Sequence, residues 1–289
     1  MRFVIDIVAY SSYQSKDQMR LTIQLLFAIL LFSISAVAQS SFTIGEIQTI
    51  ESKHLGESRT LNIYLPKGYP NDTVSYQTIY LLDGSADEDF LHIVGLVQFF
   101  DLQFQAPPTI VVGIANVDRK RDFTFPTTDK SLQKDYPTTG GSANFIAFLK
   151  DELQPYLSAN YKVNTERILI GQSLGGLLAT EILLKDPSLF TKYLIVSPSL
   201  WWDNESMYQQ MGDLIKKQKY KGIEVIVSVG KEHPMMIKEA AGLYEALTLE
   251  GGKDLKLDYQ YFEKEDHATV LHVSIYQAFK ALYGQLERD

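Results

Sequence analysis

Hydrophobic and polar positions follow two periods along the chain from residue 42 onward. Short runs rich in β-branched residues predict buried strands, and longer segments with apolar residues at helical spacing predict helices. The predicted strands are residues 44–52, 59–65, 77–82, 109–114, 167–170, 193–196, 223–229 and 257–262. The predicted helices are residues 87–104, 142–157, 177–184, 204 or 205 to 218, 234–249 and 270–286. This alternation, without an internal repeat, predicts one α/β domain with a mostly parallel sheet flanked by helices.

Glycines and polar runs mark the expected connections. The turn at Gly56 is expected to pair the first two strands antiparallel, and the pair Gly251-Gly252 is suited to cap the helix before it. The polar segment 116–141 is long for a loop in a compact domain, and such loops are usually functional or disordered.

The first 38 residues have the pattern of an export signal. Arg20 precedes the apolar run 25–32, and Ala36-Val37-Ala38 then provides a small-x-small cleavage pattern. Met19 is the natural start of such a peptide, so residues 1–18 are interpreted as an over-extended gene start. We expect cleavage after Ala38, a mature domain of residues 39–289, and residence in the periplasm or outside the cell. The alternatives are a core helix or a membrane anchor, for which the run is short.

Composition narrows the chemistry. The 289 residues include no cysteine, which excludes disulfides, thiol catalysis and thiolate metal sites. The formal net charge of −8 argues against a nucleic acid or an anionic membrane as partner. No motif indicates a metal or an organic cofactor, so we expect none.

The motif G-x-S-x-G at residues 171–175 lies between a predicted strand and a predicted helix. This is the context of a nucleophile elbow, in which a strained turn exposes the hydroxyl of Ser173. Gly171 and Gly175 are expected to remove Cβ atoms that would clash as strand and helix approach. The alternative is a glycine- and serine-containing loop that only connects two elements.

A serine hydroxyl needs a base, and His267 is the candidate. It lies in a polar loop after the last predicted strand, and the triad of α/β hydrolases runs serine, acid, histidine in chain order. We expect His54 and His92, upstream of the serine, to have surface or packing roles, whereas His233, beside a proline, and His272, inside a helix, stay open as alternatives.

The acid is expected in the loop after strand 223–229, where Glu232 is the first carboxylate. A solvated glutamate beside Lys231 is the alternative. Glu265 and Asp266 are too close in sequence to His267 to be easy partners, and a Ser-His pair without an acid stays open.

Oxyanion stabilisation requires backbone N–H groups directed at the developing charge. One is expected from Leu174, directly after Ser173. The second is expected from Gly84 or Ser85, where the absence of a Cβ at Gly84 permits close approach to a substrate, unless residues 83–84 form an ordinary turn.

Five ordered blocks resemble the Putative esterase family of α/β hydrolases, and the resemblance runs from about residue 44 to residue 286. The blocks are YLLDG (80–84), GIAN with RKRDFT (113–116, 119–124), GQSLGG (171–176), SPSLWW (197–202) and DH (266–267). The family includes siderophore esterases, feruloyl and acetyl-xylan esterases and S-formylglutathione hydrolase. The resemblance implies Ser173 as nucleophile, His267 as base, and Gly84 or Ser85 with Leu174 as oxyanion hole. Feruloyl-esterase members carry an aspartate acid, whereas some siderophore esterases use a Ser-His pair.

Two residue pairs are candidates for the substrate pocket. Trp201 and Trp202 resemble the family's aromatic pair beside the acyl or aryl pocket, and their alternative role is core packing. Arg119 and Arg121 are candidates for holding an anionic substrate group, and their alternative is pairing with Asp118 or Asp122 to fasten the long loop.

Together these features predict an exported serine esterase that works through an acyl-enzyme. The expected partner is a small-molecule or glycan-linked ester, either siderophore-like or feruloyl and acetyl esters of polysaccharides. Neither nucleic acid nor a stable membrane anchor is expected, and the oligomeric state is open. The alternatives are a non-catalytic glycan- or siderophore-binding protein and an acyltransferase of the same fold.

Overall fold

The computed structural model describes residues 18–25 and 41–284. The chain divides into two units, residues 1–43 and 44–289. Residues 18–25 form a helix whose side chains are exposed. Apart from Leu25, the predicted signal run and the cleavage pattern at 36–38 lie outside the described residues. No helix in the described part of the chain is long and apolar enough to cross a membrane.

Eight strands of the second unit form a single sheet in the order β1-β2-β4-β3-β5-β6-β7-β8. The strands are β1 (Glu46–Ser52), β2 (Glu57–Tyr64), β3 (Tyr76–Leu81), β4 (Thr109–Ile114), β5 (Val163–Gln172), β6 (Lys192–Val196), β7 (Glu224–Gly230) and β8 (Lys256–Phe262). β1 and β2 form the predicted antiparallel hairpin, and β2 is also antiparallel to β4. All other neighbours are parallel, so the predicted mostly parallel sheet is confirmed.

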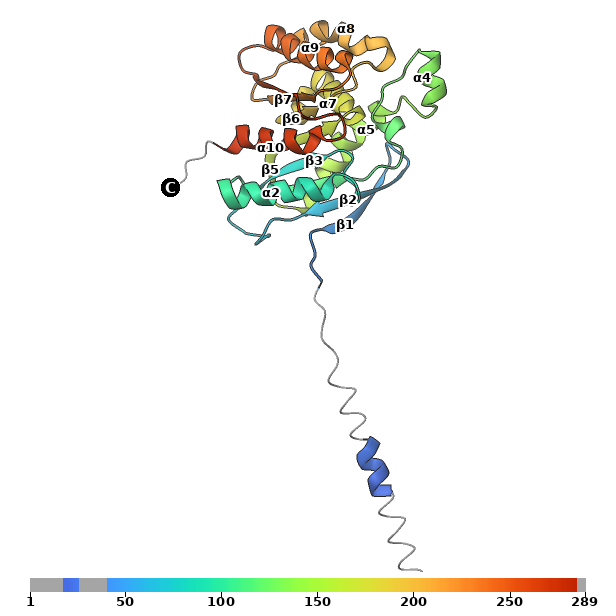
Figure 1. Ribbon diagram of the computed structural model, residues 1–289, viewed down its shortest axis with the longest axis vertical. Coiled ribbons are helices and arrows are strands. Elements are labelled where there is room, and N and C mark those ends of the chain that lie inside the picture. The colour runs from blue at the N-terminus through green and yellow to red at the C-terminus, as the bar shows by residue number, and fades with distance from the viewer. Residues whose placement is uncertain (1–17, 26–40, 285–289) are drawn as a thin grey trace, which may run out of the picture. The chain divides into compact units, whose positions relative to one another are not determined.

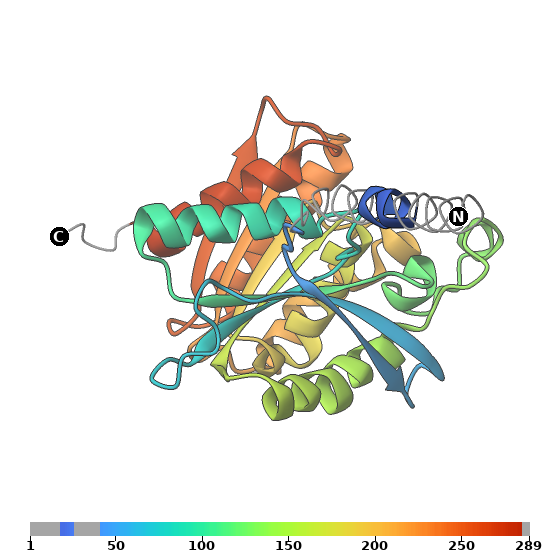
Figure 2. The same cartoon turned by 90° about the horizontal axis from the view of Figure 1, so that it is seen from below.

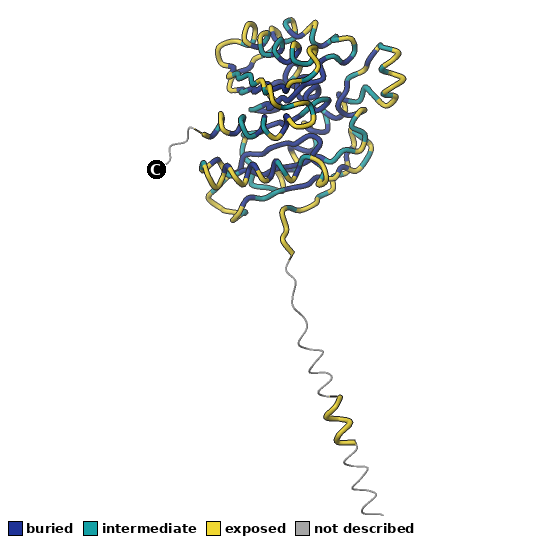
Figure 3. Tube along the Cα trace, in the orientation of Figure 1, coloured by how far each residue is buried: buried dark blue, intermediate teal, exposed yellow. Residues whose placement is uncertain are grey.

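Helices cover both faces of the sheet (Figures 1 and 2). The helices are α2 (Phe90–Phe104), α3 (Arg119–Asp122), α4 (Lys130–Asp135), α5 (Ser142–Ala147), α6 (Gln154–Asn160), α7 (Leu174–Lys185), α8 (Trp202–Lys216), α9 (Pro234–Glu250) and α10 (Val270–Tyr283). α2 and α10 pack on one face against Ile168 and Ile170, whereas Leu169 points into the larger core under α5 to α9. Alternate residues of a strand therefore serve two cores, and Figure 3 shows the strands buried between them.

Three predicted helices differ in detail. The segment 142–157 is not one α-helix, because a π-helical turn (Phe148–Leu153) separates α5 from α6. α8 begins at Trp202, earlier than predicted, but the backbone of residues 203–205 has φ between 52° and 60° and regular helix follows only afterwards. The last helix, α10, ends at Tyr283, three residues before the predicted end at residue 286.

The left-handed turn at residues 203–205 fastens the long loop. The Asp203 carboxylate accepts hydrogen bonds from the Thr127 hydroxyl at 2.6 Å and the Thr128 N–H at 3.0 Å. The segment 116–141, predicted to be polar and irregular, therefore holds two short helices, α3 and α4, and is tied to the start of α8.

Glu239 of α9 is a buried carboxyl group in this domain. Its side chain is fully buried. Burial, followed by the negative charge of Glu205, raises the pKa of Glu239 to about 8. The folded protein therefore keeps a proton that the unfolded chain releases above the ordinary carboxyl pKa of 4.5.

In wild type, the free energy of unfolding is expected to fall as the pH rises through the range in which Glu239 titrates. Glu239→Gln is expected to abolish this pH dependence. Between pH 4.5 and 8 the folded state binds more protons than the unfolded state, so the free energy of unfolding of wild type falls with pH. The melting temperatures of variant and wild type should diverge across this range, by at least about 3 °C at pH 8.5. Differential scanning calorimetry measures this, with Glu245→Gln, an exposed glutamate of the same helix, as control. Parallel curves at all pH values would contradict it.

Candidate active site

Ser173 occupies the sharp turn between β5 and α7, at the carboxyl ends of the parallel strands. Its backbone has φ 59° and ψ −119°, a left-handed conformation that is costly for a residue with a Cβ. The turn is held because the Ser173 N–H donates to the Val196 carbonyl at 3.1 Å. The Ser173 carbonyl in turn accepts from Leu177 N at 2.9 Å and Ser199 N at 3.1 Å. The backbone of Ser173 has the strained strand-to-helix geometry of a nucleophile elbow.

The glycines around Ser173 allow α7 to approach both β5 and β6 closely. A Cβ on Gly171 would lie 2.4 Å from the Gly175 carbonyl oxygen, as the sequence predicted. A Cβ on Gly175, however, would make only ordinary contacts, with none closer than 3.4 Å. The second demanding position is Gly176, whose Cβ would lie 2.9 Å from the Val196 carbonyl oxygen. The predicted role of Gly175 was therefore wrong, and Gly176 instead serves the approach of α7 to the end of β6.

His267 and Glu232 form a hydrogen-bonded pair in which the carboxylate is buried and the imidazole is partly exposed. Nδ1 of His267 lies 2.7 Å from Oε2 of Glu232, whose side chain is only 2% exposed. The other oxygen of Glu232 accepts from the Ser197 hydroxyl and from the Gly230 N–H at 3.2 Å. Burial alone would raise the pKa of Glu232, but the hydrogen bonds from His267 and Ser197 outweigh it and hold that pKa below its usual value. The carboxylate is thus ionised at neutral pH.

Two loops bring this pair together. The Lys231 N–H donates to the Glu265 carbonyl at 2.6 Å, so the loop after β7 lies against the loop after β8. The carboxylate of Asp266 accepts from Ala268 N at 2.9 Å and from Thr269 N at 3.1 Å, so it shapes its own turn and does not bind His267.

The remaining histidines have other partners. His54 pairs with Asp151 at 3.2 Å, and His233 caps α9 through its Nδ1. His92 and His272 face each other, with their Nδ1 atoms 3.4 Å apart.

An open cavity of about 370 Å³ lies over the serine. Its lining residues are Asp83, Glu88, Asp89, Arg119, Gln172, Ser173 and His267. The Gln172 amide donates to the His267 carbonyl at 2.5 Å, which ties the base's loop to the residue before the serine. Ser173 Oγ lies 3.4 Å from Ser199 Oγ, and no hydrogen bond among the described residues joins Ser173 directly to His267. Such contacts often tighten only when substrate is bound.

Arg119 reaches the cavity through a bidentate ion pair with Asp83. Its Nε and Nη2 lie 2.6 and 2.9 Å from the two Asp83 oxygens, and Nη2 also donates to the Gln172 carbonyl at 3.3 Å. Asn116 donates to the same carboxylate at 2.7 Å. Sequence reasoning missed Asp83 as a site residue, although Asp83, Asn116 and Arg119 belong to blocks that carry the family resemblance. Glu88, Asp89, Ser197 and Ser199 were also missed.

The predicted oxyanion residues differ in their backbone bonds. Among the described residues, the N–H groups of Leu174 and Ser85 make no hydrogen bond, whereas the Gly84 N–H donates to the Ile114 carbonyl at 3.1 Å. A Cβ on Gly84 would lie 2.3 Å from Gly113 Cα, so glycine is required by packing against β4. The role predicted for Gly84 is therefore corrected, and Ser85 stays the candidate.

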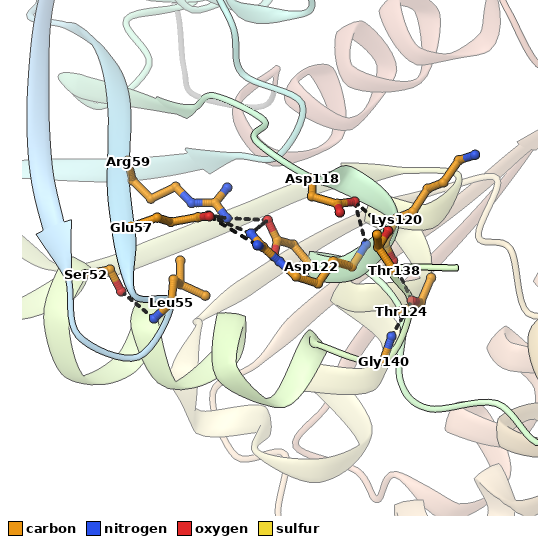
Figure 4. Close-up of polar contacts among 11 residues, drawn as sticks. Ser52, Leu55, Glu57, Arg59, Asp118, Lys120, Asp122, Thr124, Thr138 and Gly140 are labelled. Carbon is orange, nitrogen blue, oxygen red and sulfur yellow. Dashed lines mark hydrogen bonds and ion pairs between the residues drawn. The ribbon is translucent and has the colours of Figure 1, made fainter. Parts of the chain in front are cut away.

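Arg121 does not line the cavity, which corrects its prediction as a substrate group. It binds Glu57, at 2.6 Å, and Asp122, at 2.7 Å. The fully buried Arg59 contacts the same two carboxylates (Figure 4). For Arg121 the structure therefore agrees with the alternative role, in which the arginine pairs with Asp122 and fastens the long loop.

Neither tryptophan lines the cavity. Trp202 is fully buried, donates from Nε1 to the Phe125 carbonyl at 2.9 Å, and packs edge-on against Tyr136. Its predicted pocket role is therefore wrong, because the core leaves it no exposed surface. Trp201 is half-buried against the same core.

The fold and the cavity define an α/β hydrolase, and comparisons with known proteins agree. Residues 52–277 match the model of the family described as Putative esterase. Ferri-bacillibactin esterase of Bacillus subtilis is 27% identical over 270 residues, which cover 83% of this chain and 91% of that protein. The chain belongs to the Putative esterase family and is a carboxylic ester hydrolase.

Solved structures with similar folds include two bacterial relatives. An IroE-like serine hydrolase from Shewanella oneidensis has a TM-score of 0.78 at 29% identity, covering 85% of this chain and 82% of its own. The BES protein from Bacillus cereus has a TM-score of 0.74 at 30% identity, covering 84% of this chain and 97% of its own.

Proposed function

We propose that the protein hydrolyses siderophore esters through a covalent acyl-enzyme on Ser173. The observation that carries this proposal is that a left-handed Ser173 and the Glu232-paired His267 border one open cavity. The substrate class is supported by the names of its relatives, which include a ferri-bacillibactin esterase and an enterobactin esterase. The cavity's polar lining also suits an ester rich in hydrogen-bonding groups.

In the proposed mechanism, Ser173 Oγ attacks the ester carbonyl while Nε2 of His267 takes its proton. Glu232 holds Nδ1–H of the ring, which leaves Nε2 as the basic nitrogen and stabilises the imidazolium. The N–H groups of Leu174 and Ser85 stabilise the tetrahedral oxyanion. Collapse releases the alcohol with the proton from His267, and water then attacks the acyl-enzyme by the same route.

The purified protein should hydrolyse a catecholate trilactone with a higher kcat/KM than methyl ferulate or p-nitrophenyl acetate. Ser173→Ala and His267→Ala should each lose at least about a thousandfold in kcat, because members of a catalytic triad act as a unit. Chromatographic assay of the released acid measures both.

His54→Ala is the control, because His54 pairs with Asp151 away from the cavity and should keep full turnover. Retention of more than about a hundredth of the activity in Ser173→Ala would overturn the nucleophile. Binding of the trilactone without turnover would instead identify a binding protein. Transfer of the acyl group to an added alcohol in place of hydrolysis would identify an acyltransferase.

Glu232→Gln should reduce kcat/KM at least about a hundredfold, because the imidazolium loses its charge partner. The acidic limb of the pH profile should move to lower pH. Ser197→Ala should reduce kcat/KM less and should move the acidic limb of the pH profile to higher pH. Without the hydrogen bond from Ser197, more of the negative charge of Glu232 acts on the His267 imidazolium.

Ser274→Ala is the matched control for the serine change. Ser274 is also buried, but its hydroxyl has no hydrogen-bond partner among the described residues. A loss below about fivefold in Glu232→Gln would show that a Ser-His pair suffices.

We also propose that the protein is exported and trimmed to residues 39–289. This proposal is supported by the order of features in residues 20–38, in which a charged residue is followed by an apolar run and then by a small-x-small cleavage pattern. Intact-mass spectrometry of the native protein should find Gln39 as its first residue, and a protein beginning at Gln39 should be soluble and fully active. An N-terminus upstream of Leu21 on the active enzyme would contradict cleavage.

A further inference from the structure

Two histidines face each other beside the catalytic cavity. His92 is the third residue of α2 and His272 the third residue of α10, and these helices lie side by side on one face of the sheet (Figures 1 and 2). Their Nδ1 atoms are 3.4 Å apart, and their ring centroids 5.5 Å. Neither residue has a part in the proposed ester hydrolysis.

Asp89 determines which nitrogen of His92 carries the proton. Its Oδ1 lies 3.2 Å from Nε2 of His92, and a carboxylate accepts, so Nε2 is the protonated nitrogen. The lone pair of His92 Nδ1 is therefore available on the side facing His272. A carboxylate behind a histidine in this way is the usual outer contact of a metal-binding imidazole.

The distance between the two Nδ1 atoms matches shared metal coordination. In the absence of metal the two rings share a long hydrogen bond, at the upper end of the range for an N–H donor. Two nitrogens bound tetrahedrally to one zinc ion at about 2.05 Å are separated by about 3.4 Å. The rings are thus already spaced as two ligands of a single ion.

The surroundings leave such an ion accessible. His272 is exposed and His92 half-buried, so water can reach both nitrogens and fill further coordination positions. No group of three or more metal-binding side chains occurs among the described residues, so the protein supplies two ligands only. Imidazole pairs of this kind suit zinc, nickel and copper rather than magnesium or calcium.

We propose that His92 and His272 form a two-histidine site for a divalent transition metal that cross-links the starts of α2 and α10. Asp89, which orients His92, also lines the catalytic cavity. Through Asp89, metal binding therefore affects the edge of the cavity, while the ion itself lies away from Ser173. The proposal is independent of the ester substrate.

Titration of the metal-free protein with zinc chloride in a calorimeter should show one site with a Kd below about 0.1 mM. His92→Gln and His272→Gln should each weaken binding at least about tenfold, and Asp89→Asn should weaken it about tenfold. The double variant His54→Gln/His233→Gln removes two histidines elsewhere and should bind as wild type does.

Nitrogen NMR of the imidazoles provides a measurement without substitution. Zinc should shift the Nδ1 signals of His92 and His272 together while Nε2 of His92 stays protonated. Binding weaker than millimolar, equal binding by His92→Gln, or zinc shifts confined to other histidines would each overturn the site.

Discussion

The left-handed backbone of Ser173 is the constraint on which the active site depends. A residue with a Cβ adopts this conformation only when its surroundings enforce it, and here β6, α7 and the loop carrying Ser199 all bond to the serine backbone. The glycines at 171 and 176 serve the same end, because Gly171 lets β5 and α7 approach and Gly176 lets α7 approach the end of β6. The position of Ser173 at the cavity is thus a product of packing on two sides of one residue.

The parallel sheet then places the remaining groups. β7 and β8 are paired up to Gly230 and Phe262, so the loops that follow begin at the same level of the sheet. Glu232 and His267 are 35 positions apart in sequence, yet they meet two and five residues beyond those strand ends. The short contact between Lys231 and Glu265 fixes the two loops against each other.

The long loop is positioned by buried charge rather than by apolar packing alone. Arg59 and Asp122 are both almost fully buried, and Glu57 and Arg121 complete the cluster. A buried ion pair of this kind gives little net stability, but losing one partner is costly, so it restricts the loop to one arrangement. α3 is thereby held with Arg119 directed at Asp83 and the cavity.

The sequence by itself determined the eight strands, the elbow and the candidate serine and histidine. These follow from local periodicity, from G-x-S-x-G between a strand and a helix, and from chain order, all of which are properties of neighbouring residues. It did not separate Arg119 from Arg121, because nearby residues of like chemistry carry the same local signal. Residues two apart on a helical turn point to opposite sides, so one arginine faces the cavity and the other β2. Only the tertiary structure decided that Gly84 packs on Gly113, that Gly176 is the tight position, and that Ser197 holds Glu232, since each depends on a contact between distant segments.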